Sequence, residues 1–173
     1  MKRSICLTFL FLSLALTNLA HAQDYALGAG DKVEIKVFGQ PELEVTALLG
    51  NSGEVSYPFL GKIKLAGLST SQVEKLITQG LRPDYLVNPN VYAQVIEYRP
   101  FYIHGEVKAP GAYPYQPAMT VNQAVALAGG LTERASLDKI YIFKEQTKEQ
   151  QQKGSLNSQI AAGDTIKIEQ RLF

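Results

Sequence analysis

Apolar and polar side chains alternate along much of this chain, and the alternation predicts short β-strands with one buried face. Val33, Ile35 and Val37 alternate with charged residues, which is the period of two expected of such a strand. Similar alternation, or a short run bounded by turn residues, predicts further strands at residues 43–50, 54–58, 62–65, 91–96, 101–107, 112–115, 140–143 and 162–168. The polar stretch 144–158 predicts an exposed hairpin or a mobile loop.

Two segments have the pattern of capped helices instead. Ser69 with Gln72, and Thr120 with Gln123, have the spacing of a capping box at a helix N-terminus. The first helix should stop before Pro83 and the second at Gly129-Gly130. The apolar faces that we expect consist of Val73, Leu76, Ile77 and Leu81 in the first helix, and Val121, Ala124, Val125 and Ala128 in the second. Two helices separated by many strands predict an α+β fold.

The N-terminus has the organisation of a secretory signal peptide. Lys2 and Arg3 precede an apolar stretch, and Ala20-His21-Ala22 has the form of a cleavage site. We therefore expect residues 1–22 to be a signal peptide. Cys6 lies inside the apolar stretch rather than at the cleavage point, so we expect neither lipidation nor a disulfide in the mature chain.

The charge balance of the chain argues against nucleic acid as a partner. The full sequence has a formal net charge of +1, and removal of the two cations of the signal peptide, Lys2 and Arg3, would change it to −1. A nearly neutral chain lacks the basic surface that nucleic acids require.

One short sequence pattern occurs twice. Ala29-Gly30-Asp31 precedes the strand at residue 33, and Ala162-Gly163-Asp164 precedes the last predicted strand. We interpret both as a turn that leads into a strand, with the aspartate capping the turn. Gly28-x-Gly30 could also suggest a phosphate loop, but it lacks the later glycine, lysine and helix that such loops need. Isolated aspartates likewise lack the ligand number of a calcium site, and we predict no metal or cofactor.

A boundary between two modules is predicted at Arg99-Pro100. The connection is short, so we expect a rigid interface between the modules. The predicted organisation is a signal peptide at 1–22, a first β-rich module at 23–99 and a second at 100–173.

Motifs in both modules together resemble a known family. In the first module they are Tyr25-Ala-Leu-Gly-Ala-Gly-Asp31, Val33–Phe38 (VEIKVF), Gly53–Leu68 and Asn88-Pro-Asn-Val91, which resemble the polysaccharide export sequence domain. In the second they are Gly105-Glu-Val, Pro110-Gly-Ala-Tyr113, Thr120-Val121 and Ala128-Gly-Gly-Leu-Thr132, which resemble the SLBB domain, a soluble-ligand-binding β-grasp. The chain thus resembles bacterial polysaccharide export proteins.

That resemblance implies a periplasmic subunit of a capsule or exopolysaccharide export machinery. It implies homo-oligomerisation into a ring, contact with an inner-membrane polysaccharide co-polymerase, and guidance of the polysaccharide without catalysis. Longer members of the family carry a lipidated cysteine, more than one SLBB module and a C-terminal amphipathic helix, none of which the sequence indicates here. We therefore expect a short, non-lipidated form that works with a separate outer-membrane export component.

The sequence gives less support to a catalytic function. His104 has no nucleophile or orienting acid at a motif spacing, and a structural role is the simpler interpretation. Glu42 with Glu44, or Glu54 with Glu106, could be a glycosidase pair only if the fold placed them across a cleft. We expect Glu42 and Glu44 to share one solvated strand face. A periplasmic glycan hydrolase remains an alternative of lower rank than a soluble periplasmic glycan-binding sensor or adaptor.

Tyrosines concentrate around the hairpin of the second module. A tyrosine offers a sugar both a flat apolar face and a hydroxyl group, so Tyr98, Tyr102, Tyr113 and Tyr115 are the candidate contacts to glycan or to a neighbouring subunit. The alternative is that they pack in the core or pair across strands. Four further residues are interface candidates only if the fold exposes them, namely Leu60, Leu65, Leu131 and Phe173.

Overall fold

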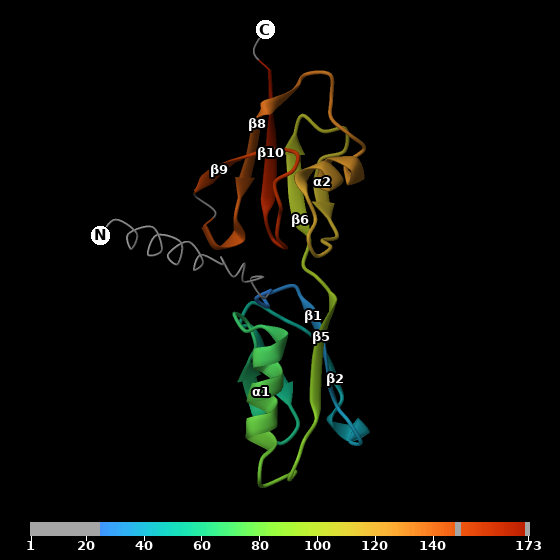
Figure 1. Cartoon of the computed structure of the whole chain (residues 1–173), viewed down its shortest axis with the longest axis vertical. Helices are drawn as coiled ribbons and strands as arrows, with labels where there is room; N and C mark the ends of the chain where they lie inside the picture. Colours follow the sequence, from blue (N-terminus) through green and yellow to red (C-terminus); the bar gives the residue numbers. More distant parts are fainter. Residues whose placement is uncertain (1–24, 148–149, 172–173) are drawn as a thin grey trace, which may run out of the picture.

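The chain folds into two β-rich units, each with its own helix and its own buried core (Figure 1). The structure is a computed structural model that describes residues 25–147 and 150–171. The predicted signal peptide, Cys6 and Phe173 lie outside the described residues. The two helices and ten strands confirm the α+β class.

The first unit pairs a three-stranded sheet with a hairpin and a helix. The antiparallel sheet has the order β2-β1-β5, and β3 pairs with β4 in a separate hairpin. The elements are β1 (Lys32–Val37), the 3-10 turn η1 (Pro41–Leu43), β2 (Val45–Leu48), β3 (Glu54–Tyr57), β4 (Gly61–Lys64), α1 (Thr70–Leu81) and β5 (Val91–Glu97).

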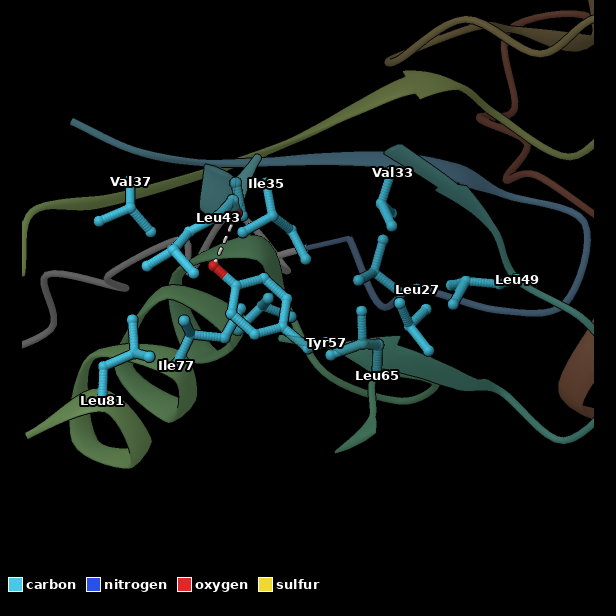
Figure 2. Close-up of a cluster of buried hydrophobic side chains, with 13 residues drawn as sticks. Leu27, Val33, Ile35, Val37, Leu43, Leu49, Tyr57, Leu65, Ile77 and Leu81 are labelled. Carbon is cyan, nitrogen blue, oxygen red and sulfur yellow. Dashed lines mark hydrogen bonds between the residues drawn. The ribbon is translucent and has the colours of Figure 1, made fainter. Parts of the chain in front are cut away.

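The core of the first unit lies between the sheet and a layer formed by α1 and the hairpin (Figure 2). Val33, Ile35 and Val37 of β1 face this core, as their alternation predicted. Tyr57 is the largest side chain enclosed there, and its hydroxyl donates to the backbone oxygen of Leu43 at 2.9 Å. A tyrosine can be buried here because its one polar group has this partner.

The second unit is a five-stranded sheet with a helix on one face. Its strand order is β7-β6-β10-β8-β9, with β10 parallel to β6 and every other pair antiparallel. A first hairpin, a helix and a last strand beside the first strand make the predicted β-grasp arrangement. The elements are β6 (Phe101–Gly105), β7 (Gly111–Tyr113), α2 (Val121–Leu127), β8 (Ala135–Phe143), the 3-10 turn η2 (Glu145–Thr147), β9 (Gln151–Gly154) and β10 (Thr165–Gln170).

Both helices begin as their sequences predicted. Ser69 and Thr120 each accept a hydrogen bond from the backbone N–H three residues on, and Gln72 and Gln123 complete the two capping boxes. The prediction of the apolar faces was wrong for one residue, Leu76. Leu76 is 37% exposed. The buried side of α1 is narrower than predicted and contains only Val73, Ile77 and Leu81.

Several strand limits also differ from prediction. β8 begins at Ala135, five residues before the predicted start. The prediction missed residues 135–139 because none of them is buried. Residues 43–50 begin with η1 rather than with a strand. The 144–158 stretch contains β9, which pairs with β8, so its hairpin interpretation is confirmed.

Of the interface candidates, Leu65 is fully buried, and Leu60 and Leu131 pack at the edges of the two cores. These three are ordinary core residues.

Candidate functional site

Arg99 joins the two units through its side chain. Its Nη1 donates to Asp31 Oδ2 at 2.7 Å in the first unit, and its Nε donates to Glu145 Oε2 at 2.7 Å in the second. The Arg99 side chain is only 12% exposed and that of Asp31 is not exposed at all. A charged hydrogen-bonded bridge of this kind fixes the orientation of the guanidinium at the junction between the two units, which we call the seam.

The repeated sequence pattern supplies the framework for this bridge. Asp31 accepts the N–H of Gly28 at 2.8 Å, and Asp164 accepts the N–H of Ala161 at 2.8 Å, so both aspartates cap their turns as predicted. Each buried carboxylate also forms an ion pair with a cationic side chain. Arg99 pairs with Asp31, and Lys144 pairs with Asp164 at 2.7 Å.

Backbone bonds reinforce the seam on the side of the second unit. The N–H of Gly163 donates to the carbonyl of Pro100, and that of Tyr102 donates to the carbonyl of Asp164. On the other side, the backbone N–H of Arg99 donates to Asp31 Oδ1 at 2.8 Å. The predicted rigid connection therefore has a physical basis in a few direct bonds.

Three tyrosines stack edge to face beside the bridge. The Tyr25 and Tyr98 ring centroids lie 4.9 Å apart at 82°, and those of Tyr98 and Tyr115 lie 5.6 Å apart at 79°. Arg99 lies over the Tyr25 ring, with its Cζ 5.3 Å from the centroid. This series of rings runs from the first unit to the second and stabilises the same seam.

The tyrosine series forms one wall of an open cleft with a volume of about 690 Å³. Residues of the bridge, of the turn before β10, and Ala26, Pro117 and Ala118 form the rest of its lining. The polar part of the lining includes Arg99, Lys144, Glu145, Gln159 and Asp164. Tyr25 and Tyr98 also border a second, shallower hollow on the first unit, between the start of α1 and β5.

The environment keeps these groups in fixed protonation states. Burial and the hydrogen bond to Asp31 raise the pKa of the Tyr25 hydroxyl far above its ordinary value. Burial by itself would lower the pKa of Arg99, but the negative charges of Asp31 and Glu145 raise it. Burial also raises the pKa of Tyr98 and Tyr115. Tyr25 therefore remains a hydrogen-bond donor and Arg99 a cation at neutral pH.

The four predicted tyrosines do not form a single site. Tyr98 and Tyr115 lie together in the cleft. Tyr113 stacks on Phe101, its cross-strand partner, and donates to the carbonyl of Ala109, which is the structural alternative. Tyr102 is exposed on the face of the sheet that points away from the core.

Sequence reasoning missed Tyr25, Arg99 and Glu145 as parts of the site. The repeated Ala-Gly-Asp turn was the available signal, since a buried aspartate needs a partner for its charge. The sequence does not say which of the distant cations supplies that partner.

The catalytic candidates lie apart or serve other roles. Glu42 lies in η1 and Glu44 follows it, so the prediction that they share a strand face was wrong. Glu44 pairs with Lys36, and Glu106 accepts a hydrogen bond from Thr132. His104 is exposed on β6. Among residues 25–147 and 150–171, no group of three histidine, cysteine or acidic side chains could hold a metal ion.

Comparison with known proteins identifies the class to which this architecture belongs. The profile described as polysaccharide biosynthesis/export protein matches residues 19–96, and that of the SLBB domain matches residues 100–155. The chain belongs to the polysaccharide biosynthesis/export protein family, with an SLBB domain after the export domain.

Its relatives have names that refer to the same process. The chain is 36% identical to the exopolysaccharide production protein ExoF of Rhizobium meliloti, over 73% of this chain and 34% of ExoF. It is 31% identical to the polysialic acid transport protein KpsD of Escherichia coli, over 65% of this chain and 21% of KpsD. It is 27% identical to the EPS I polysaccharide export outer membrane protein EpsA of Ralstonia nicotianae, over 88% of this chain and 49% of EpsA. The chain thus spans between a fifth and a half of these relatives.

No helix in the described part of the chain is both long enough and apolar enough to cross a membrane.

Proposed function

We propose that this chain is a non-catalytic periplasmic subunit of a machinery that exports capsule or exopolysaccharide, and that copies of it associate into a ring. The family and the names of its relatives support a role in polysaccharide export. The observation that carries the proposal is the Arg99 bridge between Asp31 and Glu145. Closure of a ring requires every copy to present its contact surfaces at the same angle, and the bridge fixes the angle between the two units.

The state of the polar groups in the cleft supports a structural rather than a catalytic role. Asp31, Arg99 and Glu145 satisfy one another, and Lys144 is held by Asp164. A general acid or base would need its proton-bearing atom directed at a substrate. In this cleft the charges are instead committed to holding the two units together.

A ring also needs two different, complementary surfaces on each copy. The edge strand β2 offers one of them, because no strand of the described residues pairs with its outer edge and Leu48 is 67% exposed. The opposite edge strand, β5, is partly protected, since Glu74 of α1 accepts the backbone N–H of Ala93. We therefore infer that the β2 edge contributes to the contact between copies.

The partners in this proposal are an inner-membrane polysaccharide co-polymerase, a separate outer-membrane export component and the polysaccharide itself. The chain would be periplasmic and would associate with the outer membrane through that component. Tyr98 and Tyr115 would contact the passing glycan weakly in the cleft, as transport requires.

Deletion of the gene tests the proposal against a glycan sensor or adaptor. Loss of an export subunit should trap polymer in the periplasm while synthesis continues. A sensor should instead change the amount of polymer made or the expression of the biosynthetic genes. Fractionation of polymer between periplasm and medium separates the two outcomes, and an unchanged distribution would contradict the proposal.

A further inference from the structure

The sheet of the second unit has one face that α2 does not cover. The inward side chains of β6, β8 and β10 are buried against α2, whereas the alternate residues face outward. The strand register arranges these outward residues in two adjacent rows. The row nearer the seam consists of Tyr102, Thr165, Phe143 and Gln151, and the next row consists of His104, Lys167, Tyr141 and Lys153.

The row nearer the seam provides aromatic surface. Tyr102 is 48% exposed, and Phe143 stands two strands away, with Thr165 between them. Neighbouring strands are about 4.8 Å apart, so the two rings are separated by about 10 Å. Two flat rings at that distance, with a small residue between them, form a platform on which sugar rings can stack.

The second row provides positive charge. Lys167 and Lys153 flank Tyr141, and Lys139 lies further along β8. Glu169 is the one carboxylate on the described strands of this face. It pairs with Lys167 at 2.8 Å, and the positive charge of Lys139 also stabilises its ionised form. Three lysines against one carboxylate leave the face positive at neutral pH.

The open face of the first sheet has a different composition and serves as an internal comparison. Its lysines are neutralised by nearby carboxylates, with Lys32 bonded to Glu97, and Lys36 to both Glu34 and Glu44. Such a balanced surface is ordinary solvated sheet. The cationic surplus is therefore specific to the second sheet, whereas the open face of the first sheet also has one exposed aromatic residue, Tyr92.

We propose that this open face, formed by β6, β10, β8 and β9, binds an anionic polysaccharide. Tyr102 and Phe143 stack on sugar rings, and Lys153 and Lys139 pair with the carboxylates that such polymers carry, beside the Lys167–Glu169 pair. This inference rests on the proposed export function, since that function supplies a polymer that must pass along the subunit. It goes further by assigning a second surface, distinct from the cleft, and an acidic class of ligand.

Affinity gel electrophoresis of the secreted form of the chain tests this site. The probes are two carboxylated polymers, polygalacturonate and polysialic acid, with dextran as the neutral comparison. We expect retardation by at least one carboxylated polymer and none by dextran. Lys153→Gln should weaken the binding by about threefold, as expected of one exposed ion pair, and Tyr102→Ala by about fivefold through the lost stacking. Lys75→Gln, an exposed change on α1, is the matched control and should have no effect.

The outcomes separate this inference from the proposed function. Absence of retardation by both carboxylated polymers, equal retardation by dextran, or an equal loss in Lys75→Gln would overturn the binding site even if gene deletion traps polymer. Binding that depends on Tyr102 and Lys153, in a strain where deletion leaves export unchanged, would support the site and refute the export role.

Discussion

Arg99 and Asp31 form a buried ion pair in which the guanidinium Nη1 lies 2.7 Å from Asp31 Oδ2, while the Arg99 backbone N–H bonds the other carboxylate oxygen. The two residues are far apart in sequence and meet where the last strand of the first unit leads into the second. The same guanidinium reaches Glu145. One side chain thus couples the entry turn of the first unit to the second unit.

Replacement of Arg99 by methionine should destabilise the chain strongly. The substitution keeps an unbranched apolar stem but leaves the Asp31 carboxylate buried without its cation, which costs about 3 kcal/mol. Urea unfolding of the variant measures the loss. Arg82→Met is the matched control, because Arg82 makes one exposed hydrogen bond to Asn88 and should change stability by less than about 1 kcal/mol. Equal losses in the two variants would show that the bridge has no special role.

The two turn-capping aspartates should differ in importance although their turns are alike. Asp31→Asn should cost more than Asp164→Asn, because the Arg99 partner is 12% exposed and the Lys144 partner 33% exposed. We expect about 3 kcal/mol for the first substitution and about 1 kcal/mol for the second. Chemical denaturation of both variants checks the order, and a larger loss for Asp164→Asn would contradict it.

Gly105 should tolerate no side chain. It has φ of +92°, and a Cβ there would overlap the carbonyl oxygen of Ile168 on the neighbouring strand. Gly130 has a similar φ of +96°, but a Cβ there would meet nothing within 4 Å. Gly130→Ala should therefore cost only the backbone strain, about 1–2 kcal/mol, and Gly105→Ala clearly more. Thermal unfolding of the pair isolates the steric contribution, and similar melting temperatures would refute it.

Alkaline pH should weaken the first core through Tyr57. Burial raises the pKa of its hydroxyl to about 12 from an ordinary value of 10. The folded state holds the proton more tightly than the unfolded state, so this stabilisation is complete below pH 10 and is lost as the pH rises toward 12.

Tyr57→Phe separates this contribution from those of other tyrosines. At neutral pH the variant should be less stable by about 1 kcal/mol, because the carbonyl of Leu43 loses its donor. The difference in unfolding free energy between the two proteins should shrink between pH 10 and 12. A constant difference over that range would mean that Tyr57 does not titrate as expected.

Local patterns predicted the secondary structure well wherever one face of an element is buried. The capping boxes at Ser69 and Thr120 and the alternation in β1 depend on neighbours within a few residues, and the structure contains all three. The start of β8 was missed because its first half has no buried residue, and its one large apolar residue, Leu137, is 56% exposed. Leu76 was misplaced because the width of the covered helix face depends on the sheet strand packed against it, β5.

The site was less accessible to prediction for a different reason. Tyr98 and Tyr115 were among the candidates and lie together in the cleft, but the residues that join them to a bridge come from three separate segments. Which cation neutralises Asp31 is decided by the pairing of β5 with β1, which brings Arg99 beside Asp31, and no local pattern encodes that choice. Tyr102 and Tyr113 lie on the β6–β7 hairpin, between the other two candidates in sequence, yet strand register directs them to opposite faces of the sheet.

Native mass spectrometry of residues 23–173, together with the Arg99→Met variant, tests the central claim most directly. The account predicts a closed oligomer with one dominant copy number, which becomes heterogeneous or dissociates in the variant because the angle between the units is no longer fixed. A strict monomer at all concentrations, without any export component that co-purifies, would contradict it.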